Sequence, residues 1–80
     1  MSNLELYNKA FTEALGVEEK DLKGLQYQGI PNWDSVGHMN LIAALEDAFD
    51  IMMDTDDIID FSSYEKGKEI MGKYKIEVRG

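Results

Sequence analysis

Serines stand at four places where a helix is expected to begin: Ser2, Ser35, Ser62 and Ser63. Such a serine is ordinarily an N-cap, whose side-chain oxygen accepts a backbone hydrogen bond, and we interpret three of the four in this way. Ser35 differs because a long loop leads into it and a largely apolar helix leads away from it. A phosphate ester on its hydroxyl would lie at the positive end of that helix, where backbone N–H groups and the helix dipole favour an anion. The residues permit such a modification but do not require it.

The single histidine, His38, follows Ser35 by three residues. Histidine can shuttle protons near neutral pH, but nucleophilic catalysis needs a base that is held against a nucleophile and oriented by a third group. The sequence suggests no acid or nucleophile as a partner for His38. We therefore expect His38 to be a surface or docking residue, and we expect Trp33 to pack over the loop rather than bind a ligand.

The acidic segment from Asp54 to Glu65 has the length of a calcium-binding loop. Its fifth position is Ile58, which has no side-chain oxygen, and its sixth is Ile59, where the sharp turn requires glycine. An EF-hand is therefore excluded, and only weak cation binding by these acids stays open. With no cysteine and one histidine, the chain is not expected to build a zinc site either, so we predict no metal centre.

Acidic residues outnumber basic residues by sixteen to eight, which gives a formal charge of −8. This charge repels nucleic acids and anionic membranes, and it favours docking onto basic patches of other proteins. No stretch is long and apolar enough to span a membrane, and the first residues lack the order of a secretory signal. The 80 residues are expected to form one domain over residues 1–80, in a cytoplasmic and monomeric protein.

Helices are the elements that must position Ser35. Apolar residues share one helical face over residues 3–15, Ser2 and Glu5 form a capping-box pattern at its start, and Gly16 ends it. A nearly continuous apolar run follows Ser35, so the helix that begins there must be largely buried. Nothing in the sequence alternates as a strand would.

We predict an all-α bundle of four helices, near residues 3–15, 35–50, 56–61 and 63–75, with a long first loop and a short third helix. The loop is expected to be ordered by its own apolar side chains, and residues 76–80 are expected to fray. In the last helix, Ser62 and Glu65 repeat the capping-box pattern, and Gly67 would permit close helix packing. The predicted core consists of Leu4, Phe11, Leu15, Ile42, Leu45, Phe49, Ile59 and Met71.

The segment Asp34-Ser35-Val36 opens the second predicted helix, which continues through Ala44-Leu45-Glu46 and closes with Phe49-Asp50. This segment resembles the acyl and peptidyl carrier proteins, whose modified serine stands in an Asp-Ser-Leu motif at the start of the second of four helices. The resemblance extends more loosely to both ends of the chain. It implies a four-helix, acyl-carrier-like bundle.

The resemblance also implies a cofactor and partners. A phosphopantetheinyl transferase would attach the 4′-phosphopantetheine of coenzyme A to Ser35, and acyl groups would then be carried as thioesters on its thiol. The second helix would dock onto basic patches of acyl or aminoacyl ligases and synthases. The implied docking residues are the acids Asp34, Glu46, Asp47 and Asp50, with Val36 and Met39 as apolar anchors.

Two departures from the family bear on the pathway. Fatty-acid carriers usually have acids at the positions of Gly37 and Asn40, and Trp33 with the Gly37-His38 pair looks more like carriers of specialised pathways. Fatty-acid and specialised acyl or aminoacyl biosynthesis both stay open. The alternative function is an unmodified small acidic helical module for protein interactions, in which Ser35 is only a cap. An enzyme is the least favoured class, because one histidine offers no nucleophile and base pair.

Overall fold

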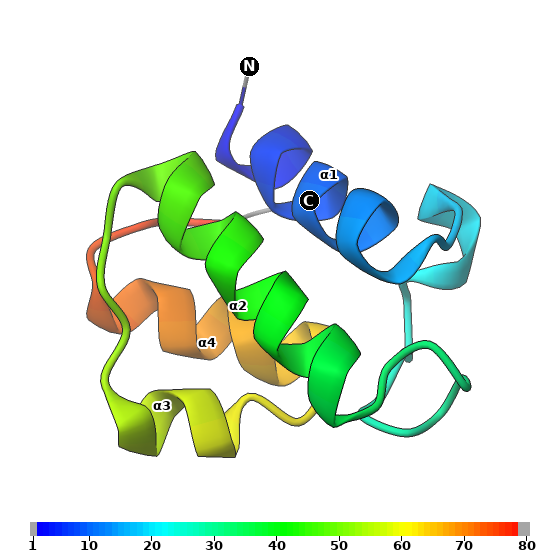
Figure 1. The fold of residues 1–80 in the computed structure, drawn as a ribbon. Helices are drawn as coiled ribbons and strands as arrows, with labels where there is room; N and C mark the ends of the chain where they lie inside the picture. The colour runs from blue at the N-terminus through cyan, green and yellow to red at the C-terminus, as the bar shows by residue number, and fades with distance from the viewer. Residues whose placement is uncertain (1, 79–80) are drawn as a thin grey trace.

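The computed structural model describes residues 2–78, and this part of the chain folds into four α-helices without a strand (Figure 1). The helices are α1 (Asn3–Leu15), α2 (Ser35–Phe49), α3 (Thr55–Asp60) and α4 (Tyr64–Lys73), and a short 3-10 turn, η1, covers Glu19–Asp21. The predicted all-α fold with a long first loop and a short third helix is confirmed. No helix among residues 2–78 is both long enough and apolar enough to cross a membrane.

Local capping residues set the helix ends. The predicted capping box of Ser2 and Glu5 opens α1, and Gly16 closes it in the left-handed conformation, with a φ of 67°. The predicted box at Ser62 is wrong, because Ser63 is the N-cap of α4 and its Oγ accepts from the backbone N–H of Lys66 at 2.9 Å. The carbonyl of Ser62 is instead held by the first loop. The helices α1, α2 and α4 all begin and end within two residues of the predicted bounds.

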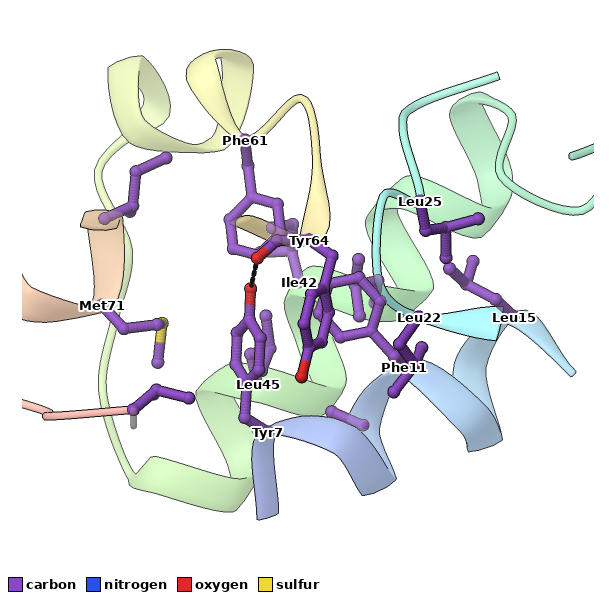
Figure 2. Close-up of a cluster of buried hydrophobic side chains, with 14 of the residues drawn as sticks. Tyr7, Phe11, Leu15, Leu22, Leu25, Ile42, Leu45, Phe61, Tyr64 and Met71 are labelled. Atoms are coloured by element: carbon purple, nitrogen blue, oxygen red, sulfur yellow. Dashed lines mark hydrogen bonds between the residues drawn. The ribbon is translucent and has the colours of Figure 1, made fainter. Parts of the chain in front are cut away.

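The core is built mainly from aromatic and branched side chains that α1, α2, α4 and the first loop contribute (Figure 2). Of the predicted core, Leu4 and Phe49 are partly buried and five residues are buried as predicted: Phe11, Leu15, Ile42, Leu45 and Met71. Ile59 is a wrong prediction, since 72% of it is exposed. Neighbouring residues of a helix point about 100° apart, and in the short α3 it is Ile58 that packs against the core.

Tyr7 organises the contact between α1 and α4. Its ring is buried, and its hydroxyl donates to the backbone carbonyl of Tyr64 at 2.7 Å (Figure 2). Burial in this apolar setting raises the pKa of the Tyr7 hydroxyl. A Cβ added at Gly67 would overlap the Tyr7 hydroxyl and the Phe61 ring. The close packing that we predicted at Gly67 is therefore confirmed.

The first loop is ordered, as predicted, and is attached to the start of α4. Leu22 and Leu25 are buried. The N–H of Tyr27 donates to the carbonyl of Ser62, and the N–H of Tyr64 donates to the carbonyl of Leu25, both at 2.9 Å. These bonds fix the segment that leads into α2.

The C-terminal segment returns to α1 (Figure 1). Val78 is buried, and the side-chain amide of Asn3 donates to the carbonyl of Glu77 at 3.1 Å. The expected fraying is therefore wrong for residues 76–78, because the side chain of Val78 packs into the core and the carbonyl of Glu77 is bound by α1. Residues 79 and 80 of that expectation lie outside the described residues.

Candidate functional site

Ser35 is the first residue of α2 and not its cap. The cap is Asp34, whose Oδ1 accepts from the N–H of Gly37 at 2.8 Å. Ser35 is exposed, and its hydroxyl has no hydrogen-bond partner among residues 2–78. The possibility that Ser35 serves only as a cap is therefore wrong. Its hydroxyl is available at a helix N-terminus, where the helix dipole and unpaired N–H groups favour an anionic substituent.

The loop before Ser35 is held in place by contacts with the end of α1 and with the first turn of α2. The side-chain amide of Asn32 donates to the carbonyl of Leu15 at 2.9 Å, and Trp33 is completely buried. The carbonyl of Asn32 lies against Gly37 so closely that an added Cβ would overlap it. Glycine at position 37 thus has a packing reason, because any side chain there would displace the loop that positions Ser35.

An apolar groove of about 350 Å³ begins at Ser35 and runs between α2 and α3. It is open to solvent, and most of its surface is carbon. Its walls are formed by Tyr27, Ser35, His38, Met39, Ile58, Ile59, Phe61 and Ser62. A group attached to Ser35 would lie next to this groove.

His38 is half-buried and connects three segments, so it is not the surface residue that we expected, and its role in docking stays a prediction. The indole N–H of Trp33 donates to Nδ1 of His38 at 2.9 Å, and Nε2 of His38 lies 2.8 Å from the carbonyl oxygen of Ile58. An indole nitrogen can only donate and a carbonyl can only accept, which assigns the neutral tautomer with the proton on Nε2. Sequence reasoning missed this role because Ile58 is twenty residues away.

The residues that the family resemblance implies for docking differ in their surroundings. Val36 and Met39 are 69% and 55% exposed on the first turns of α2, and Asp47 and Asp50 are exposed further along it. Glu46 is half-buried, and its Oε2 accepts from the N–H of Met53 at 2.9 Å.

Glu46, like the capping residue Asp34, therefore has a structural task. The exposed face of α2 is apolar beside Ser35 and acidic only towards its far end. Ile59 of α3, which shares the groove with Met39, adds an exposed apolar side chain that the sequence did not indicate.

A second polar cluster joins α3 to α4 away from Ser35. Asp57 accepts from the hydroxyl of Tyr74 at 2.6 Å and from Nζ of Lys73 at 2.9 Å. The Tyr74 hydrogen bond, followed by that of Lys73, lowers the pKa of the Asp57 carboxyl. Residues 2–78 contain no group of three or more histidine, cysteine or acidic side chains arranged to hold a metal ion. We therefore interpret this cluster as a clamp between the two helices.

Comparisons of this chain with known protein families, curated proteins and solved structures found no match. The functional argument therefore depends on the sequence around Ser35 and on the geometry of its site. That geometry combines an accessible hydroxyl, a helix N-terminus, a rigid support and an adjacent apolar groove.

Proposed function

We propose that this protein is an acyl carrier protein, built on an acyl-carrier-like bundle, with 4′-phosphopantetheine attached to Ser35. A phosphopantetheinyl transferase joins the Ser35 oxygen to the phosphorus on the pantetheine side of coenzyme A. The bond from that phosphorus to the nucleotide side breaks, adenosine bisphosphate leaves, and the serine proton is released. Acyl or aminoacyl groups are then carried as thioesters on the thiol of the arm, in fatty-acid or specialised biosynthesis. The chain has no cysteine, so this thiol is imported.

The accessible hydroxyl of Ser35 is the observation that carries the proposal. A serine that capped its helix would have its oxygen occupied, but Asp34 performs that task here. The hydroxyl can thus enter the active site of a transferase while α2 stays intact. After transfer, the phosphate diester would lie at the N-terminus of a fifteen-residue helix, which is a favourable place for an anion.

In this proposal the protein is a substrate of other enzymes and not a catalyst. Activation of Ser35 from within the chain would need a general base close to its oxygen. Both ring nitrogens of His38 are engaged, with Trp33 and Ile58. The base that takes the serine proton therefore comes from the transferase.

Partner docking in this proposal uses an apolar contact beside Ser35 and a weaker acidic contact at the far end of α2. Val36, Met39 and Ile59 surround the attachment point with exposed apolar surface. Asp47 and Asp50 add negative potential that attracts basic patches of transferases, ligases and synthases.

Intact mass measurement tests the proposal directly. The protein is incubated with coenzyme A and a broad-specificity phosphopantetheinyl transferase, and we expect the mass to rise by one phosphopantetheine. A thiol reagent should then label the product and leave the untreated protein unlabelled, since the chain has no cysteine. Ser35→Ala should abolish both the mass gain and the thiol labelling.

The matched control is Ser62→Ala, because Ser62 lines the same groove and is also exposed. This variant should keep both the mass gain and the labelling. A mass gain that persists in Ser35→Ala, or no gain in the wild type, would refute the proposal.

Two single variants separate the apolar and electrostatic parts of docking. We expect Met39→Ala to slow phosphopantetheinyl transfer at least as much as Asp47→Lys, because the surface beside Ser35 is apolar. Asp47→Lys should instead flatten the dependence of the rate on salt, since exposed charges act mainly through their summed field. Asp47 is the proper choice for charge reversal because the carboxylate of Glu46 binds the backbone of Met53. Unchanged kinetics in both variants would remove this face from the docking model.

A further inference from the structure

His38 ties α2 to α3 directly beside Ser35. Its Nε2–H donates to the carbonyl of Ile58 at 2.8 Å, and its Nδ1 accepts from the indole of Trp33 at 2.9 Å. The groove that begins at Ser35 lies over this bridge. A chain that started at Ser35 and entered the bundle between α2 and α3 would have to pass His38.

A layer of aromatic rings fills the space below the groove. Trp33 is completely buried and Phe61 almost completely. The imidazole of His38 lies beside the indole of Trp33 with nearly parallel ring planes, 17° apart, and it meets the Phe61 ring at 67° with centroids 6.2 Å apart. Phe11 of α1 closes the layer from the other side, 5.6 Å from Trp33 and 6.0 Å from Phe61 between centroids.

Opening this layer would break polar contacts as well as packing. If His38 moved outwards, the indole N–H of Trp33 would be left buried without an acceptor, which is unfavourable. The rings below are close-packed, so a long alkyl chain would also have to displace Trp33 or Phe61. A short group meets neither obstacle, because it fits in the groove of about 350 Å³ outside the bridge and does not have to enter the bundle.

We infer that the group carried on Ser35 is a short acyl or aminoacyl group that stays at the surface, and that His38 and the rings beneath it exclude long chains from the bundle. This inference rests on the proposed function, and it specifies the class of cargo. His38 acts as a specificity-determining residue that positions α3 against α2 and makes no bond to the cargo.

Loading with acyl groups of different length tests the inference. The wild-type protein is loaded from acetyl-, octanoyl- and dodecanoyl-coenzyme A with the same transferase, and intact mass confirms each product. The rate of thioester cleavage by hydroxylamine then reports whether the acyl group is accessible. For the wild type we expect the three rates to agree within about twofold, since no product has to open the bundle before it reacts. The fluorescence of Trp33, the single tryptophan, should also be the same in all three products.

Removing the bridge should create a dependence on chain length. His38→Ala removes both hydrogen bonds of the bridge between α2 and α3. The long chain can then enter the bundle, so dodecanoyl cleavage should become several-fold slower than acetyl cleavage. Ser62→Ala is the matched control, since Ser62 lines the groove but makes no bridge; its rates should not depend on length. If His38→Ala does not fold, Trp33→Phe keeps a buried aromatic ring but removes the indole donor and part of the ring above the core. The same gain in length dependence is expected.

Each outcome decides a separate point. Dodecanoyl cleavage that is slower by about tenfold or more in the wild type would show a buried long chain and overturn the inference, while the mass gain would still support the carrier function. Rates independent of length in both His38→Ala and Trp33→Phe would remove His38 as the barrier. A wild type that gains no mass from any coenzyme A thioester would refute the carrier function, and the inference would fall with it.

Discussion

The two glycines of α4 should respond in opposite directions to the same substitution. In Gly67→Ala the new methyl group overlaps the Tyr7 hydroxyl and the Phe61 ring, and its Cβ would lie 2.6 Å from Cε1 of that ring. Overpacking of this kind costs about 2 kcal/mol, and losing the buried bond from Tyr7 to the carbonyl of Tyr64 costs about 2 kcal/mol more. The gain in helix propensity returns about 1 kcal/mol. The net expected loss is about 3 kcal/mol, which lowers Tm by more than about 10 °C in a domain of this size.

Gly72→Ala is the matched control, because nothing lies within 4 Å of the Cβ that would be added there. It should raise stability by a few tenths of a kcal/mol to about 1 kcal/mol through helix propensity alone. Urea unfolding, followed by far-UV circular dichroism and by the fluorescence of Trp33, measures both changes. If Gly67→Ala were as stable as the wild type, the packing of Tyr7 and Phe61 against α4 described above would be wrong.

Two further substitutions test the polar contacts of α4. Tyr7→Phe keeps the buried ring but leaves the carbonyl of Tyr64 without its donor, so the free energy of unfolding should fall by about 1–3 kcal/mol; a loss within measurement error would mean that another donor replaces the hydroxyl. Asp57→Asn tests pH dependence: because Tyr74 and Lys73 lower the pKa of Asp57, its contribution is present above the unfolded value of about 4 and is lost as the pH falls through the folded value. Urea midpoints across this range should fall less steeply with acid in Asp57→Asn than in the wild type, and parallel profiles would contradict the clamp.

Local signals were sufficient to predict the helices. The apolar period of α1, the capping box of Ser2 and Glu5, and the left-handed Gly16 are properties of short segments, and each appears where it was predicted. The start of α4 was harder, because Ser62 and Ser63 offer equivalent hydroxyls. The choice between them depends on the backbone bond from Tyr27 to Ser62, which a distant loop provides.

The surroundings of Ser35 were predicted less completely, since they depend on partners that are remote in the sequence. The acidic residue Glu46 looks the same in sequence whether it faces a partner or binds the backbone of Met53. Similarly, nothing in the segment around His38 indicates that the carbonyl of Ile58 will accept a hydrogen bond from its ring. The exposure of Ile59 follows from how the short α3 is rotated, which its six residues do not determine by themselves.

The site joins a fixed backbone to an accessible hydroxyl, and this combination is what the proposed carrier function requires. Asp34 caps the helix, Gly37 admits the loop and Trp33 is anchored in the core, so the position of Ser35 is fixed without any use of its hydroxyl. An enzyme would need a base oriented towards that oxygen, yet the single histidine is bound on both sides by structural partners. The ring of His38, which could have acted as that base, instead connects Trp33 and Ile58 next to Ser35. In the proposed function this division is useful, because the partner enzyme supplies the chemistry while the carrier presents one hydroxyl in a constant position.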